Sequence, residues 1–166
     1  PDVRFRNVHK LYLPGLTHPV VTTVRMDDAP PVIAFKNSCE LHYFELHYFG
    51  MTFKTCKEFE IIGEGAYKSV DGIIYSADMS ILVKCPAGRE GKIVIPDGVV
   101  EIAPGAFSNS RIQEVVFPDS LRKIGMSAFA FCKRLERVDF GHGLKEIGDY
   151  DNNNCFRSCS KISSLD

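Results

Sequence analysis

Apolar residues recur at a fixed distance in the second half of the chain, from Gly91 to Asp166. An isoleucine follows each short run of β-branched and aromatic residues, at Ile102, Ile124 and Ile147. The spacings are 22 and 23 residues (124 − 102 and 147 − 124). A period of this length is typical of a solenoid, in which each coil buries its apolar face only against its neighbours. The pattern therefore predicts a stack of coils.

Apolar residues inside one repeat follow a spacing of three and then two positions. The residues that this spacing places inward are Ile112, Val115 and Phe117 in one repeat and Leu135, Val138 and Phe140 in the next. Strict alternation, which marks a regular strand, begins only at about Val138. Pro118 ends the segment because it cannot donate a hydrogen bond to a strand ladder. Each repeat therefore begins with a short strand.

The second half of each repeat predicts a corner and a turn. Leu121 and Ile124 begin another side of the coil, and Gly125 follows at a corner where a positive φ favours glycine. Ala128 and Phe129 are then expected to turn inward on a short helical or 3₁₀ segment. The expected fold class is α/β, as a right-handed, β-rich solenoid with short helical or 3₁₀ turns and one inserted β-hairpin.

Residues 1–62 carry the same spacing in an irregular form. The segment Phe53–Ile62 matches Phe129–Val138 at four positions with identical offsets, and Ala34–Phe35 resembles Ala106–Phe107. Four matches at identical offsets are hard to attribute to chance. We therefore expect irregular coils in the first third of the chain as well.

Residues 63–91 differ from the parts on either side. Two apolar runs, Ser69–Ser76 and Ser80–Cys85, flank a small polar loop. Short β-rich runs around such a loop predict a β-hairpin, which we expect to extend the sheet. The whole chain, residues 1–166, is thus expected to form a single solenoid with regular repeats of 22–23 residues over 92–166.

The last repeat contains four additional residues. Ile147 and Phe156 lie nine positions apart, whereas Ile124 and Phe129 lie five apart. The insertion belongs to the polar tract Asp149–Cys155, which begins like a calcium loop of the D-x-D-x-N type. It lacks the glycine at the sixth position and the bidentate glutamate at the twelfth, so a solvated turn is favoured over a calcium site.

Three of the six cysteines, Cys56, Cys132 and Cys159, occupy the same repeat position. One interpretation is a redox or metal ladder. Buried thiols that pack as small apolar groups are favoured, because nothing nearby in the sequence would stabilise a thiolate. Cys155 lies four residues before Cys159, and a disulfide between these two remains an alternative in an oxidising compartment.

The pentad Glu-Leu-His-Tyr-Phe occurs twice in succession, at Glu40–Phe44 and Glu45–Phe49. His42 and His47 are five residues apart, which places them on opposite faces of a strand and out of register on a helix. Zinc binding by this pair is therefore poorly supported. Aromatic packing or an aromatic contact surface is favoured, and no metal site or cofactor is expected.

Charge and composition exclude several classes of partner. The chain has 166 residues with 20 Lys and Arg against 21 Asp and Glu, so binding to a nucleic-acid polyanion is not expected. No apolar run approaches the roughly 20 residues that cross a bilayer, so no membrane insertion is expected. The chain begins at Pro1 without a secretory signal, which indicates a mature product or an excised fragment. It stops at Asp166 part-way into a strand, and this open edge is a candidate for self-association.

The repeat pattern reads Leu-x-x-Val-x-Phe-Gly/Pro-x-x-Leu-x-x-Ile-Gly-x-x-Ala-Phe-x-x-Cys over 112–134 and 135–161, and over 93–111 without the cysteine. In this pattern the chain resembles the BspA-like leucine-rich repeat family, well over 59–166 and loosely over 1–58. The resemblance implies a solenoid of the leucine-rich-repeat type in a surface-exposed or secreted bacterial protein from a host-associated anaerobe. That family shares no catalytic motif, so no catalytic residues are carried over and no enzyme is expected.

The expected function is a non-enzymatic, cell-surface or secreted module for adhesion or binding, with a protein or a glycan as its partner. A parallel sheet presents its outward side chains in rows, which suits such a partner. The candidate contact residues in these rows are Val94, Gln113, Val116, Arg137 and Asp139. The alternative is a structural spacer segment of a larger surface protein. The extracellular location rests on the family resemblance.

Overall fold

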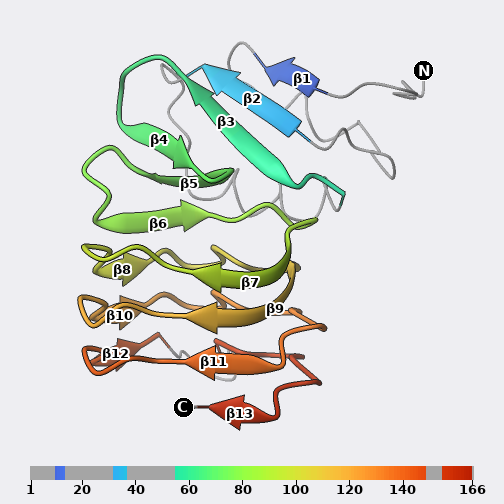
Figure 1. The fold of residues 1–166 in the computed structure, drawn as a ribbon, viewed down its shortest axis with the longest axis vertical. Coiled ribbons are helices and arrows are strands. Elements are labelled where there is room, and N and C mark those ends of the chain that lie inside the picture. The colour runs from blue at the N-terminus through green and yellow to red at the C-terminus, as the bar shows by residue number, and fades with distance from the viewer. Residues whose placement is uncertain (1–9, 14–31, 37–54, 149–154, 166) are drawn as a thin grey trace.

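A computed structural model of the protein describes residues 10–13, 32–36, 55–148 and 155–165. These residues form three β-sheets, two of which run side by side along the stack of coils while the third lies at the N-terminal end (Figure 1). The third sheet is parallel and contains β1 (Lys10–Leu13), β2 (Val32–Lys36) and β3 (Glu58–Ile62).

The two sheets of the stack each receive one strand from every regular coil. The four-stranded sheet is parallel and consists of β7 (Glu90–Val94), β9 (Arg111–Val116), β11 (Arg137–Asp139) and β13 (Ser164–Leu165). The six-stranded sheet consists of β4 (Tyr67–Val70), β5 (Ile73–Ser76), β6 (Ile81–Lys84), β8 (Glu101–Ile102), β10 (Lys123–Ile124) and β12 (Glu146–Ile147). The predicted β-solenoid is therefore present.

The predicted inward positions of the four-stranded sheet are correct. Ile93, Val115 and Val138 pair in register across β7, β9 and β11, and their exposed fractions are 4%, 0% and 0%. Their neighbours on either side point outward, as the period of two in a strand requires. β9 ends at Val116, so Pro118 lies beyond the strand as predicted.

The spacing of three and then two has a structural cause in β9. Gly91 pairs with Ile112 whereas Lys92 pairs with Glu114, so Gln113 is an extra residue on β9. Such a β-bulge lets two residues three positions apart face the same side. Ile112 and Val115 are consequently both buried. The strand therefore begins earlier in this repeat than strict alternation suggests.

The helical or 3₁₀ segment expected at Ala128 and Phe129 is wrong. The described residues contain no helix, and 126–131 form a succession of turns. Ser127 and Phe131 have φ of 54° and 62°, values that a right-handed helix excludes. The α/β label is therefore replaced by an all-β description of these residues.

Backbone donors in these turns alternate between two kinds of acceptor. The N–H groups of Gly105, Phe107 and Asn109 donate to carbonyls of the next coil, at Met126, Ala128 and Ala130, over 3.0, 2.7 and 2.9 Å. The N–H groups of Ala106 and Ser108, which lie between them, donate to carbonyls three residues earlier, both over 3.1 Å. A ladder between coils thus occupies the donors that a helix would use within one segment.

Gly125 is required at its corner for a reason other than the positive φ expected from the sequence. Its φ is not among the positive values, and neither is that of Gly148. A Cβ atom on Gly125 would lie 2.7 Å from the Cα of Pro104 in the preceding coil. The close approach of two coils, rather than a left-handed backbone, excludes a side chain there.

Strands β4, β5 and β6 form an antiparallel meander where one hairpin was expected. β5 and β6 pair antiparallel, as the two apolar runs predict. The first run, however, is divided into β4 and β5 at Asp71 and Gly72, whose φ values are 47° and 71°. Two successive positive φ values are the mark of a type I′ turn, and Asp-Gly favours it. β6 then pairs in parallel with β8, so the meander continues the six-stranded sheet.

The N-terminal sheet contains one further correction. Ala34 and Phe35 lie in β2, not in a turn equivalent to Ala106 and Phe107. The short apolar pair fits either environment, and the parallel pairing of β2 with β1 and β3 decides it. Cys56 and Phe59 are buried, as the alignment with the later repeats predicts.

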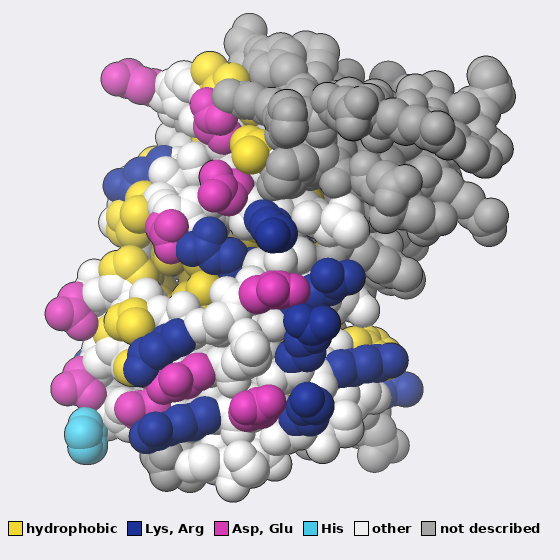
Figure 2. Space-filling model, turned by 45° about the vertical axis from the view of Figure 1, so that its right-hand side comes forward, with side chains coloured by type: hydrophobic (Ala, Val, Ile, Leu, Met, Phe, Trp, Pro, Cys, Tyr) yellow, Lys and Arg dark blue, Asp and Glu magenta, His cyan; other side chains and the backbone are white. Residues whose placement is uncertain are grey.

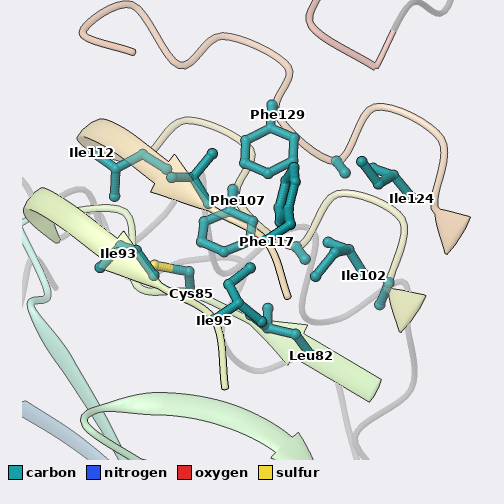
Figure 3. Close-up of a cluster of buried hydrophobic side chains, with 14 of the residues drawn as sticks. Leu82, Cys85, Ile93, Ile95, Ile102, Phe107, Ile112, Phe117, Ile124 and Phe129 are labelled. Carbon is teal, nitrogen blue, oxygen red and sulfur yellow. The ribbon is translucent and has the colours of Figure 1, made fainter. Parts of the chain in front are cut away.

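One continuous apolar core runs through the stack from the meander to the last coil. Figure 3 shows the part of this core between Leu82 and Phe129. Phe107 and Phe129 stack with ring centroids 4.7 Å apart, and Phe129 stacks on Phe156 at 5.1 Å. Phe117, which directly follows β9, packs edge-on against Phe129, with ring centroids 5.8 Å apart. Identical residues in equivalent positions thus form a column at the spacing of the coils.

Candidate functional site

The outer face of the four-stranded sheet carries the first predicted row of contact residues. Val94 pairs with Val116, and Val116 pairs with Asp139, so the three side chains project from adjacent strands in one line. Val94 is 63% exposed, whereas Val116 and Asp139 are half-buried. Asp139 Oδ1 accepts a hydrogen bond from the N–H of Gly141 over 3.2 Å. The row thus presents apolar surface with a carboxylate at one end.

A second row lies two positions earlier in each strand. Lys92, Glu114 and Arg137 pair in register, and Lys92 Nζ lies 2.8 Å from Glu114 Oε1. Gln113, at the bulge, is exposed and accepts a hydrogen bond from the N–H of Gly91 over 2.5 Å. Arg137 is also exposed. Four of the five predicted contact residues therefore lie in two adjacent rows of one sheet, and Gln113 lies beside them at the bulge of β9.

Opposite charges join neighbouring coils, and in one case coils two apart, at the start of this sheet. Glu90 lies 3.8 Å from Arg111 and 3.1 Å from Arg134, and Lys161 lies 3.8 Å from Glu136. Figure 2 shows Lys and Arg side chains interspersed with Asp and Glu side chains over the regular coils. Exposed pairs of this kind contribute little to stability but leave no large area of one charge. The face is therefore mixed in charge, with Val94 as its most exposed large apolar residue.

A contact between two coils lies just beyond the C-terminal ends of β9 and β11, between Asp119 and His142. Asp119 Oδ1 accepts a hydrogen bond from the backbone N–H of His142 over 2.9 Å and lies 3.1 Å from its Nδ1. The backbone hydrogen bond from His142, with that of its ring, lowers the pKa of Asp119. Both side chains are exposed, so this contact orders the corner without forming an enclosed site.

The most unusual polar residue of the core was not identified from the sequence. Lys84 is 1% exposed, and its Nζ donates to Gly105 O over 2.7 Å and to Ser108 Oγ over 3.3 Å. Burial lowers the pKa of Lys84 to about 8. A signal was present, because the alternation in β6 places Lys84 on the same face as the buried Leu82.

The cysteines of the described residues are free thiols, and four of them are buried. Burial raises the pKa values of Cys56 and Cys85 to about 12, as packed thiols require. Cys155 and Cys159 are not joined to each other in this structure. Cys159 is half-buried, and a hydrogen bond from Cys132 lowers its pKa.

Two sequence motifs lie outside the described residues. The Glu-Leu-His-Tyr-Phe pentads, with His42 and His47, fall within 37–54, and most of the Asn-rich insertion falls within 149–154. In the part of the chain that the structure describes, no group of three or more His, Cys, Asp or Glu side chains could hold a metal ion. That part also contains no helix with the length and apolar character needed to cross a membrane.

Residues 90–166 match the family model described as the BspA type leucine rich repeat region, in six copies. This range begins at β7 and covers the four-stranded sheet with all five predicted contact residues. A search of curated protein sequences gave no match.

Solved structures with a similar fold come from bacterial proteins. The chain is similar to a leucine rich cell surface protein from Faecalibacterium prausnitzii, with a TM-score of 0.59 and 20% identity over 95% of this chain and 41% of that one. It is also similar to the pneumococcal vaccine antigen PcpA, with a TM-score of 0.51 and 19% identity over 74% of this chain and 33% of that one. The chain thus spans less than half the length of either protein. At this identity the likeness shows the fold.

Proposed function

Because residues 90–166 belong to the BspA-type leucine-rich repeat family, we propose that the chain is a non-enzymatic binding module of a bacterial cell-surface or secreted protein. The partner is a protein or a glycan, bound on the outer face of the four-stranded sheet. The family and the cell-surface description of one structural relative support the extracellular location.

The observation that carries the proposal is the row Val94, Val116 and Asp139. Val94 is 63% exposed on β7, the edge strand of the sheet, and the row adjoins a second row of charged groups two positions earlier. Apolar contact area surrounded by hydrogen-bonding groups is the usual composition of a protein interface. Parallel pairing fixes the spacing of the rows, so a partner meets a rigid, repeated surface.

The test is retention of partners by the immobilised protein. Purified wild-type protein is probed with host extracellular-matrix proteins and with a glycan array. The double substitution Val94→Asp with Val116→Asp adds two negative charges to the row without entering the core, and it should weaken binding at least tenfold. No retained partner for the wild-type protein, or equal binding by the double variant, would contradict the proposal.

Val100→Asp is the control for the single substitution Val94→Asp, since each adds one negative charge. Val100 is 41% exposed, precedes β8 and thus lies next to the six-stranded sheet. The same chemical change there should leave binding unchanged. A loss of binding in this variant as large as that of Val94→Asp would assign the effect to net charge rather than to the row.

The second candidate is a structural spacer in a larger surface protein, which the cross-coil ion pairs of Glu90, Glu114 and Glu136 favour. A spacer needs stiffness and an inert face. It predicts that the full-length protein keeps every interaction when Val94 and Val116 are replaced by aspartate, which distinguishes it from the binding module.

A further inference from the structure

Two cysteine thiols are stacked in adjacent coils at the C-terminal end of the core. Cys132 and Cys159 follow Phe129 and Phe156 by three positions, and these rings stack at 5.1 Å. Ser110 holds the equivalent place one coil earlier, with its Oγ 3.4 Å from Cys132 Sγ. The three side chains therefore form a column parallel to the phenylalanine column.

Each thiol of the column reaches the backbone of the preceding coil. Cys132 Sγ donates to Phe107 O over 3.0 Å, and Cys159 Sγ donates to Phe129 O over 3.0 Å. Phe129 O also accepts a hydrogen bond from the N–H of Cys132 over 3.2 Å. Cys159 Sγ thus lies directly beside the residue that carries the other thiol.

We propose that Cys132 and Cys159 are a thiol modification site, at which an external disulfide converts the two thiols into a disulfide bond between adjacent coils. Parallel neighbours in a stack lie about 4.7–4.9 Å apart, within the Cα separation of about 4.4–6.8 Å that disulfides adopt. Formation of the bond requires that Cys132 Sγ leave Phe107 O, to which it now donates, and turn towards Cys159.

The chemistry is two successive thiol–disulfide exchanges. The Cys159 thiolate attacks one sulfur of an external disulfide, which forms a mixed disulfide and releases one thiol. The Cys132 thiolate then attacks Cys159 Sγ, which forms the bond between coils and releases the second external thiol. Two protein thiols are oxidised and one external disulfide is reduced to two thiols.

The environments of the two cysteines fit these roles. Cys159 is half-buried and accessible to a reagent, and its pKa is lowered by the hydrogen bond from Cys132. Cys132 is fully buried, and burial raises its pKa, so it reacts only after its neighbour. Cys56 and Cys85 are buried thiols with pKa values of about 12 and are expected to stay reduced.

The bond would fasten the last coil. Residues 132 and 159 enclose the segment that contains the four inserted residues of the last repeat. Closing this loop restricts the unfolded chain, so oxidation should raise the melting temperature. The inference goes beyond partner binding, since it concerns the stability of the stack and not its outer face.

The test is thiol counting and peptide mapping of the full chain in a series of glutathione disulfide and glutathione ratios. After denaturation, the number of reactive thiols should fall from six to four. A linked peptide pair containing Cys132 and Cys159 should appear and disappear on reduction. A persistent glutathione adduct at Cys159, a bond from Cys155 to Cys159, or no loss of thiols would each overturn the proposal.

Matched variants separate the bond from a folding effect. Cys132→Ser reproduces the residue that the column already has at Ser110, and it should stop the reaction at the mixed disulfide on Cys159. Cys159→Ser should leave all five remaining thiols reduced. Cys155→Ser should keep the Cys132–Cys159 bond and the rise in melting temperature. A linked pair in the Cys155→Ser variant that lacks Cys132 or Cys159 would contradict the assignment.

Discussion

Between β7 and β12 every strand pairs in parallel with the strand of the next coil, whereas β4, β5 and β6 pair antiparallel. The regular coils repeat one set of inward residues, so equivalent residues of adjacent coils pack against each other. The meander does not carry this set of residues. β6 connects the two arrangements, because it pairs antiparallel with β5 on one side and in parallel with β8 on the other.

The comparison shows how a repetitive stack can be joined to a non-repetitive element. Ile73 and Tyr75 of the meander belong to the same core as the coils. At the joint, however, the inward face of β6 ends in Lys84, a polar residue that bonds to Gly105 and Ser108 of the neighbouring coil. The coils gain stability from identical contacts, and the joint uses a specific hydrogen-bonded group.

The largest effect is expected from the phenylalanine column. Phe129→Ala removes a fully buried ring that stacks on two others, and should lower the free energy of unfolding by about 3–5 kcal/mol. Urea denaturation followed by circular dichroism measures it. Phe131→Ala is the control, because Phe131 is 41% exposed under Arg157 and should cost under about 1 kcal/mol. Equal costs would mean that the column does not hold the coils.

The role of Lys84 between the meander and the coils is tested by the pH dependence of the free energy of unfolding. The pKa of Lys84 falls from an ordinary 10.5 to about 8 on folding, so between these values the unfolded state binds more protons and stability rises with pH. Lys84→Met lacks this gain. The difference in unfolding free energy between wild type and variant should therefore shift by about 3 kcal/mol in favour of the wild type from pH 7 to pH 10.5.

The paired comparison is needed because other groups oppose the trend. Cys56 and Cys85 have pKa values raised from 9.0 to about 12, so their contribution to stability is lost as pH rises above 9. Both proteins share the loss from Cys56, and subtraction removes it. The charge of Lys84 lowers the pKa of Cys85, so the difference reports Lys84 together with its effect on Cys85. A difference that is constant from pH 7 to pH 10.5 would show that Lys84 is solvated in solution.

A smaller effect separates the two explanations for glycine at the corner. Gly125→Ala should cost about 1–3 kcal/mol, because its Cβ meets the backbone of Pro104. Gly125→Asn should cost at least as much. Asparagine tolerates a positive φ better than alanine does. If Gly125→Asn were clearly more stable than Gly125→Ala, a left-handed backbone would be the reason for glycine at this position. Thermal unfolding of both variants decides it.

The smallest effect is expected on the outer face. Lys92→Ala removes the exposed pair with Glu114 and should cost about 0.5 kcal/mol or less, with no cost at high salt. Urea titrations at low and high ionic strength measure it. A cost that approaches that of Phe129→Ala would mean that charge pairs, rather than the core, hold successive coils together.

Sequence alone identified the coils because every repeat imposes the same environment on equivalent residues. The inward positions of Ile112, Val115 and Leu135 followed from spacing, and the alignment of Val94 with Val116 followed from the period. Both depend on local pattern, which one sequence displays. Asp71-Gly72 was an available turn signal that the continuous apolar run around it concealed.

The rest depends on contacts between coils. Ala128 and Phe129 are compatible with a helical turn, and only the donors and acceptors of the neighbouring coil make the ladder. Gly125 fits a left-handed corner until Pro104 is placed against it. The burial of Lys84 depends on acceptors 21 and 24 residues later. Pairing across such distances is not visible in a single apolar pattern.

The alternating donors of the turns have a consequence for amide exchange with solvent. The amide of Ala106 or Ser108 bonds within its own turn and is released when that turn opens alone. The amide of Phe107 or Asn109 bonds to the next coil and is released only when two coils separate. Deuterium uptake should therefore be fast at Ala106 and Ser108 and slow at Phe107 and Asn109. Neither a helix nor a free loop produces such alternation.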